Sequence, residues 1–397
     1  MPLLLRGATL VDGTTADVRL DGARIAAVAP ALQPAPGEEL VELRGRLLCP
    51  AFVEPHAHLD KAFLADRFDN PTGDLMGAIE VMESIRGLIT IDDTIERAER
   101  AVRLMVSNGV TAVRTHADLT VQNGLRSVEA LLQVRESMRE ICDVQVVCLT
   151  GWSVLDEAAP EQVDLVREAI AMGVDVLGGC PHLDTDPVRA TDVLMLLAVE
   201  GEIPVDLHTD ETLDPTVLGV QDLAKWVSST GFPHGVTASH CVSLGVQPAE
   251  VQAAVAEEIA AAGISVITLP HTNLFLQGRQ HPSCQPRGLT ALAALRAAGV
   301  NVAAGADNLQ DPFNLVGKGD PLETAALMVM AGHYLPADAF LACTAAARHA
   351  LGIEAVKVEA GAPAELVAIP AADVRRAIAN QPGGRLTIHR GRVVAGE

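Results

Sequence analysis

Short apolar segments alternate with amphipathic, alanine-rich stretches through the middle of the chain. Eight apolar segments, each ending in polar residues, are PAFVEPHAH (50–58), VTAVRTHADL (110–119), VQVVCLTGW (144–152), VDVLGGCPHL (174–183), IPVDLHTDE (203–211), GVTASHCVSL (235–244), ISVITLPHTN (264–273) and NVAAGADN (301–308). Strands of this length with helices between them are typical of parallel β/α units. Eight such units predict a closed (β/α)8 TIM-like barrel, an α/β fold whose site lies at the C-terminal ends of the strands.

The two ends of the chain show a different pattern. Short β-like runs fill the first fifty residues, and Asp-Gly pairs at 12–13 and 21–22 separate them as hairpin turns do. The last forty residues, with ELVAIP and GRLTIHRGRVVAGE, have the same character. We therefore expect a small composite β-sandwich built from residues 1–49 and 351–397, with the catalytic barrel over residues 50–350.

Composition narrows the class of protein. Of 397 residues, 49% are hydrophobic and 20% are charged, which allows a large core and argues against disorder. The net charge of −22 and the absence of a basic cluster argue against a nucleic-acid partner. We see no signal peptide and no membrane span, and the seven cysteines are scattered without a CxxC pair. These features predict a cytoplasmic protein with reduced thiols and no membrane partner.

The histidines supply the candidate chemistry. His56 and His58 share one face of a strand, because side chains at i and i+2 point the same way. His208, His240 and Asp307 stand at the ends of the fifth, sixth and eighth predicted strands. Each histidine could be structural by itself, but their joint position favours a metal site. Imidazole and carboxylate ligands suit a divalent metal ion, Zn²⁺ or Fe²⁺.

Six stretches resemble the amidohydrolase superfamily and, within it, the cytosine deaminase branch, which includes the N-isopropylammelide amidohydrolases. They are VEPHAHLDK, VRTHADL, VDLHTDE, VTASHC, LPHTNLFLQGR and GADNLQDPF, spread over residues 53–313. The resemblance implies that one metal ion binds His56, His58, His208 and Asp307. It also implies that Glu211 is the proton shuttle and that His240 contacts the attacking water.

The proposed roles agree with the chemistry of the residues. A divalent metal lowers the pKa of bound water, and Asp307 is a carboxylate that can take the proton of that water. Glu211 can protonate a ring nitrogen, although Asp210 competes for this role and a solvated loop carboxylate is the structural alternative. No lysine lies between Lys61 and Lys225, which excludes a lysine bridge from the second to fifth strands. We therefore expect a single metal, although Cys180 could bridge two in principle.

Substrate contacts are less defined by the sequence. Gly151 stands where cytosine deaminases carry a glutamine after the third strand, so we expect cytosine to be a poor substrate. Trp152 and Phe313 offer stacking faces for a planar ring, or else pack the barrel rim. Further substrate-binding candidates, with interior hydrogen bonding as the alternative, are Lys61, His182 and Asn308. The same alternatives apply to His116, Asp118 and Asp184.

Together these features predict a metal-dependent hydrolytic deaminase. Its substrate would be a small planar N-heterocycle of the cytosine, isocytosine, creatinine or triazine type. The alternative is cleavage of a ring or exocyclic C–N bond with release of a larger amine. A non-catalytic barrel should have lost its ligands or Glu211, and this chain keeps all of them. Members of the branch often assemble as homo-oligomers, and we expect one here.

Overall fold

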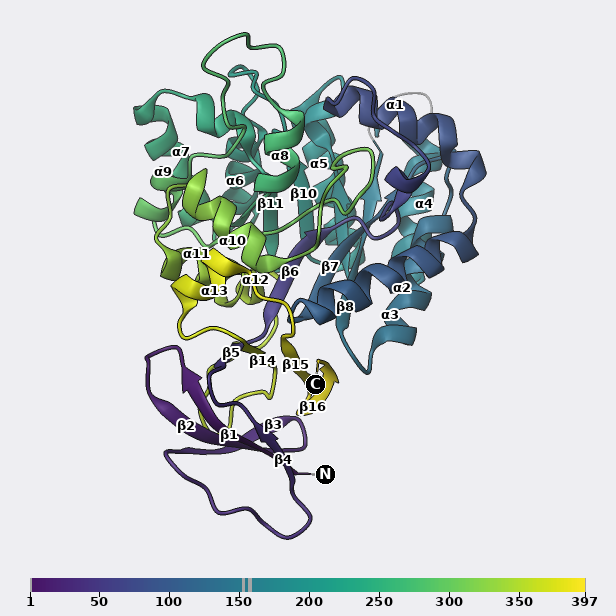
Figure 1. Ribbon diagram of the computed structural model, residues 1–397. Helices are drawn as coiled ribbons and strands as arrows, with labels where there is room; N and C mark the ends of the chain where they lie inside the picture. The colour runs from purple at the N-terminus through teal and green to yellow at the C-terminus, as the bar shows by residue number, and fades with distance from the viewer. Residues whose placement is uncertain (1, 152–153, 156–158, 397) are drawn as a thin grey trace.

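A barrel carries a β domain at one end in the computed structural model, which describes residues 2–151, 154–155 and 159–396 (Figure 1). Eight parallel strands in the order β13-β12-β11-β10-β9-β8-β7-β6 form the barrel wall. They are β6 (Phe52–Ala57), β7 (Val110–Leu119), β8 (Asp143–Thr150), β9 (Val176–Gly179), β10 (Val205–Thr209), β11 (Val236–His240), β12 (Ser265–Thr268) and β13 (Val302–Ala304). Each falls within or overlaps a predicted segment, so the predicted (β/α)8 TIM-like barrel is confirmed.

Helices surround the barrel wall, and most of them connect its strands. They are α1 (Leu75–Ile85), α2 (Ile91–Ser107), α3 (Arg126–Met138), α4 (Ala159–Ala171), α5 (Pro187–Gly201), α6 (Gly219–Thr230), α7 (Ala249–Ala261), α8 (Pro270–Leu276), α9 (Leu292–Ala297), α10 (Pro321–Met330), α11 (Pro336–Ala342), α12 (Ala345–Ala350) and α13 (Val374–Asn380). The buried faces of most of them contribute apolar side chains to one large core with the strands, while α1 and α12 belong to smaller apolar clusters. Helix α2 is an example, since its buried positions recur every three or four residues.

The seam between β13 and β6 closes the barrel beside two of the candidate metal ligands. Asp307 lies opposite Ala57 in a parallel bridge, and its backbone N–H donates to the carbonyl of His56 at 3.1 Å. The buried carboxylate of Glu54 accepts the N–H groups of Ala306 and His56 at 3.0 and 3.2 Å. These contacts fix the two strand ends that carry His56 and Asp307.

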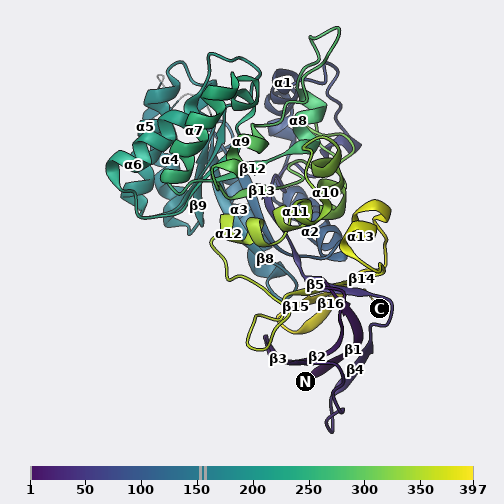
Figure 2. The same ribbon diagram turned by 90° about the vertical axis from the view of Figure 1, so that its left-hand side faces the viewer.

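The terminal strands form one separate sheet of mixed direction in the order β16-β15-β14-β5-β1-β2-β3, with β4 paired to β1. Its strands are β1 (Leu3–Leu10), β2 (Thr15–Asp21), β3 (Arg24–Ala29), β4 (Glu39–Glu42), β5 (Leu47–Pro50), β14 (Leu366–Ile369), β15 (Leu386–His389) and β16 (Arg392–Ala395). N-terminal and C-terminal strands lie side by side in both views (Figures 1 and 2). The prediction that both ends of the chain build one small β domain is confirmed.

This β domain contacts the barrel at the start of α10 and near the N-terminal end of β7. Arg385 donates to Asp320 at 2.6 Å, and the Thr387 hydroxyl donates to the carbonyl of Val106 at 2.7 Å, just before β7 begins. The C-terminal strand ends therefore lie away from this contact, next to α1 (Figure 1). In the described part of the chain, no helix combines the length and apolar character needed to cross a membrane.

Candidate active site

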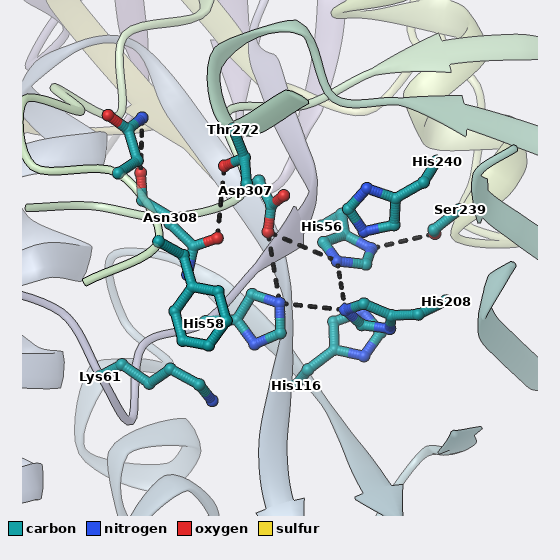
Figure 3. Close-up of polar contacts among 12 residues, drawn as sticks. His56, His58, Lys61, His116, His208, Ser239, His240, Thr272, Asp307 and Asn308 are labelled. Atoms are coloured by element: carbon teal, nitrogen blue, oxygen red, sulfur yellow. Dashed lines mark hydrogen bonds and ion pairs between the residues drawn. The ribbon is translucent and has the colours of Figure 1, made fainter. Parts of the chain in front are cut away.

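Three imidazoles and one carboxylate converge at the C-terminal end of the barrel (Figure 3). His208 Nε2 lies 3.2 Å from His56 Nε2 and 3.1 Å from His58 Nε2. Asp307 Oδ1 lies 3.2 Å from His58 Nε2 and 3.7 Å from His56 Nε2. All four side chains are buried. The sequence placed these residues on three separate strands, and the barrel brings their donor atoms together.

The ionisation of this cluster fits a metal site. Burial, with the neighbouring histidines, holds the pKa of His56 and His208 well below the ordinary value, so both rings are neutral and keep a lone pair. Burial opposes ionisation of Asp307, but the contact with His58 outweighs it and lowers the pKa of Asp307. Neutral imidazoles and a carboxylate are the forms that bind Zn²⁺ or Fe²⁺. The donor set therefore fits a divalent ion.

A hydrogen-bonded chain holds the ring of His56. Its Nδ1 lies 2.9 Å from the Ser239 hydroxyl, which donates to Asp206 Oδ1 at 2.7 Å. The other oxygen of Asp206 accepts from Arg114 at 2.9 Å. Ligand histidines in metal sites commonly have such a partner on the second ring nitrogen. Ser239 and Asp206 were missed by sequence analysis, since neither lies at a strand end.

His116 extends the cluster below the candidate ligands. Its ring centroid lies 4.0 Å from that of His56 and 4.8 Å from that of His208. Two groups of donor atoms come together within 4.8 Å: His56, His58 and Asp307, and His56, His116 and His208. Burial holds the pKa of His116 well below the ordinary value. His116 is therefore a neutral ring beside the same nitrogens and a further potential ligand.

Glu211 and His240 face the same space. The carboxylate oxygen Oε1 of Glu211 lies 3.6 Å from His240 Nδ1, and both residues line the main pocket. Burial and the nearby charge of Asp307 raise the pKa of Glu211 well above its ordinary value. The amide nitrogen of Asn273 donates to His240 Nδ1 at 3.1 Å, so the proton of the neutral ring is on Nε2. Burial lowers the pKa of His240 to about 4.

Asp210 has different surroundings from Glu211. Its carboxylate accepts the N–H groups of Gly219 and Val220 at 2.8 and 2.9 Å, at the start of α6. It is absent from the pocket lining. Of the two adjacent carboxylates, Glu211 is therefore the one that faces the pocket.

The backbone is strained at two of these side chains. His240 and Asp307 have φ angles of 68° and 64°, in the left-handed region that side-chain-bearing residues seldom adopt. Such strain often concentrates at functional sites, where the surrounding structure holds it in place. Here it turns two strand ends so that His240 and Asp307 face the cluster.

A pocket of about 680 Å³, including its open mouth, lies over the cluster. One wall is apolar and comes from α1, with Leu75, Ile79 and Met82. Two predicted substrate contacts, Asn308 and Phe313, line it as well. Asn308 donates to Asp311 at 2.9 Å, which fixes the direction of its amide. The helix α1 wall was not predicted, because its amphipathic pattern does not say which surface it covers.

Lys61 also lines the pocket and belongs to a buried charge network. Its ammonium group donates to Asp118 at 2.6 Å and to Asp60 at 3.1 Å. Charge on Lys61 outweighs burial and lowers the pKa of Asp118 to about 2. The structure therefore unites Lys61 and Asp118, which sequence analysis listed separately.

Two other predicted contacts have different outcomes. His182 lies beside β10, where its Nδ1 is 3.0 Å from the backbone carbonyl of His208, and it is absent from the pocket lining. Its role in substrate binding stays a prediction. Trp152 lies outside the described residues.

Comparisons with known proteins agree with this geometry. The model of the amidohydrolase family matches residues 62–395. Pterin deaminase from Rhizobium rhizogenes is 33% identical over 361 residues, covering 89% of this chain and 82% of that protein. The 5-methylcytosine deaminase structure from Klebsiella pneumoniae has a TM-score of 0.89 and 29% identity, covering 100% of this chain and 98% of that one. N-isopropylammelide isopropylaminohydrolase from Burkholderia multivorans has a TM-score of 0.87 and 29% identity, with the same coverage.

A parallel barrel with a cluster of histidines and an aspartate at its strand ends is an arrangement typical of metal-dependent hydrolases. The chain belongs to the amidohydrolase family. It is a hydrolytic enzyme of the aminohydrolase type, as the predicted resemblance implied. The family is metal-dependent, and the cluster supplies residues that can bind the ion.

Proposed function

We propose that this enzyme deaminates a planar N-heterocycle by hydrolysis. Water adds to the ring carbon that bears the amino group, the C–N bond breaks, and ammonia leaves with a carbonyl in its place. One observation carries the proposal: two carboxyl groups with opposite pKa shifts, Glu211 and Asp307, line one pocket with the histidine cluster. Paired groups with separated pKa values are typical of acid and base assignments.

The residues divide the work of proton transfer. A single divalent metal held by His56, His58, His208 and Asp307 would supply an acidified water at neutral pH. The second oxygen of Asp307 can accept a proton from the attacking water. Burial raises the pKa of Glu211 and favours its protonated form, so its carboxyl group can donate a proton to a ring nitrogen as water adds. The resulting carboxylate can take the proton of the added hydroxyl group as the carbonyl forms and pass it to the leaving amine. The proton that Asp307 took from the water then returns Glu211 to its starting form.

In this proposal His240 stabilises the oxygen that adds to the ring carbon. Its Nε2 carries the proton, because Asn273 donates to Nδ1. Among described residues no side chain accepts a hydrogen bond from this buried Nε2. A neutral imidazole N–H can therefore donate to the developing carbonyl oxygen.

Similar proteins support the class of substrate. A relative at 33% identity is a pterin deaminase, and a structural neighbour at 29% identity is a 5-methylcytosine deaminase. Their named substrates share an amino-bearing planar ring. The likeness to N-isopropylammelide isopropylaminohydrolase favours the second candidate, release of a larger amine.

A product screen tests the proposal. The metal-loaded enzyme is incubated with pterin, 5-methylcytosine, cytosine and N-isopropylammelide, and ammonia and isopropylamine are measured separately. We expect ammonia from at least one ring, with kcat/KM above about 10⁴ M⁻¹s⁻¹ for the best one. We expect cytosine to be at least about 100-fold poorer, which corresponds to about 2.7 kcal/mol. Isopropylamine alone would establish the second candidate, and no amine from any compound would refute both.

A further inference from the structure

Arg86 is a charged side chain in the apolar wall of the pocket. It follows directly after α1 and lines the pocket beside Ile79 and Met82. Its side chain is only 11% exposed. Burying a guanidinium costs free energy unless acceptors face its N–H groups. The free-energy cost of burying this guanidinium beside the histidine cluster suggests that Arg86 has a role in the pocket.

Arg86 contacts two acceptors, Thr120 and Asp118, and Asp118 is also the partner of Lys61. Its NH1 lies 3.3 Å from the Thr120 hydroxyl and 3.6 Å from Asp118 Oδ2. The other oxygen of Asp118 accepts from Lys61 at 2.6 Å. Within the described residues both contacts use NH1, and Nε and NH2 make no hydrogen bond there. Arg86 therefore lines the pocket with two donors, Nε and NH2, that make no hydrogen bond among the described residues, while Thr120 and Asp118 contact NH1.

The side chain of Thr120 occupies space that a side chain at position 151 would otherwise fill. A Cβ atom at position 151 would lie 2.8 Å from Thr120 Cγ2, closer than real contacts allow. Gly151 and Thr120 both line the pocket. The absence of a side chain at 151 therefore lets Thr120 stand in the pocket wall and hold Arg86.

We infer that Arg86, oriented by Thr120 and Asp118, is a specificity-determining residue that donates a hydrogen bond to a ring carbonyl of the substrate. The inference rests on the proposed function and narrows its substrates to amino-oxo heterocycles that reach from the histidine cluster to the α1 wall. Gly151 is required because it admits Thr120. Such a ring presents the amino carbon to Glu211 and His240 and its carbonyl oxygen to Arg86.

The local charge favours a neutral acceptor. Two cations, Lys61 and Arg86, face two carboxylates, Asp60 and Asp118. A ligand carboxylate would add a third negative charge beside Asp118. A carbonyl oxygen accepts from the guanidinium without this repulsion, and a hydrogen bond to a charged donor is stronger than a neutral one.

Binding of two matched compounds tests the inference without relying on turnover. Pterin and 2-aminopteridine share the bicyclic ring and the amino group, and only pterin has the carbonyl oxygen. Calorimetry with metal-loaded wild type should give a Kd for pterin at least about tenfold lower than for 2-aminopteridine. Arg86→Met should reduce this preference to within about threefold. The exposed Arg67, which pairs with Asp93 outside the pocket, provides the control Arg67→Met with an unchanged preference.

Further variants separate recognition from a structural effect. Thr120→Val removes the hydroxyl that holds NH1 and should reduce the preference in part. Gly151→Ala should weaken pterin binding through the clash with Thr120 Cγ2, and adding Thr120→Ser should restore it. Where wild type turns pterin over, Arg86→Met should raise KM more than it lowers kcat.

The outcomes distinguish the two proposals. A wild type that binds pterin selectively but releases no ammonia from any compound of the screen refutes the proposed function and leaves the recognition role supported. Equal binding of the two compounds by wild type, binding of neither, or equal losses for both in Arg86→Met overturns the role of Arg86.

Discussion

At the scale of single residues, the neighbouring carboxylates of Asp210 and Glu211 have different surroundings, and we therefore assign them different roles. Glu211 faces the pocket and Asp210 faces the backbone of α6. Sequence spacing alone left both open as the general acid. The choice depends on which way each side chain turns after β10, and Asp210 has a φ of 54°, which no spacing rule predicts.

We predict that Glu211→Gln lowers kcat by about a hundredfold or more, because the amide cannot donate the proton that a carboxylic acid supplies. Metal content and melting temperature should stay near those of wild type. Steady-state kinetics of ammonia release gives kcat, elemental analysis gives the metal content, and thermal unfolding gives the melting temperature. Asp210→Asn is the matched comparison and should keep kcat within about tenfold. The reverse ranking of the two variants would show that Asp210 is the acid.

A second residue-scale prediction concerns the support of His56. Ser239→Ala removes the partner of Nδ1 and should lower metal affinity by about 10- to 100-fold, the usual effect of losing such a partner. Competition with a chelator gives the affinity. Ser229→Ala, at an exposed position on α6, should leave it unchanged. Unchanged affinity in Ser239→Ala would mean that His56 needs no such support.

At the scale of elements, the existence of each strand could be predicted from the sequence. The exact ends of the strands and the placement of the helices over them were harder to predict. The segment 110–119 coincides with β7, and all of its residues except Asp118 are buried, the polar ones included. Segment 174–183 yields only Val176–Gly179, since Pro181 begins a short 3-10 helix over Pro181–Leu183. The place of α1 over the pocket could not be predicted, since an amphipathic pattern gives a buried face but not its partner.

Asp210, which accepts hydrogen bonds from the start of α6, should make the stability of the fold depend on pH. Burial raises the pKa of Asp210 from 3.8 to about 6. The folded state then binds the proton more tightly than the unfolded state, so this contribution to stability is full below pH 3.8 and is lost as pH rises through 6. Relative to Asp210→Asn, wild type should lose about 2 kcal/mol of unfolding free energy between pH 4.5 and 7. Urea unfolding of both proteins at the two pH values measures this, and a gain in relative stability would contradict it.

At the scale of the whole molecule, the order of polar strand ends along the chain was enough to predict the barrel and the histidine cluster. A barrel places all strand ends on one rim, so residues from 56 to 307 meet there. His116 shows the limit of this reasoning. It lies on β7 within the same cluster, and spacing could not separate a ligand from an interior histidine. Arg86 was missed because it follows a helix, and only the fold brings it to the pocket.

The central claim is that one metal ion in this cluster makes the barrel a deaminase. The most direct test adds metal in steps to chelator-treated protein and follows ammonia release from the best heterocycle of the screen. We predict no turnover without metal, a linear rise to one equivalent per chain, and no further rise beyond it. Turnover in metal-free protein, or a rise that ends only at two equivalents, would contradict this account.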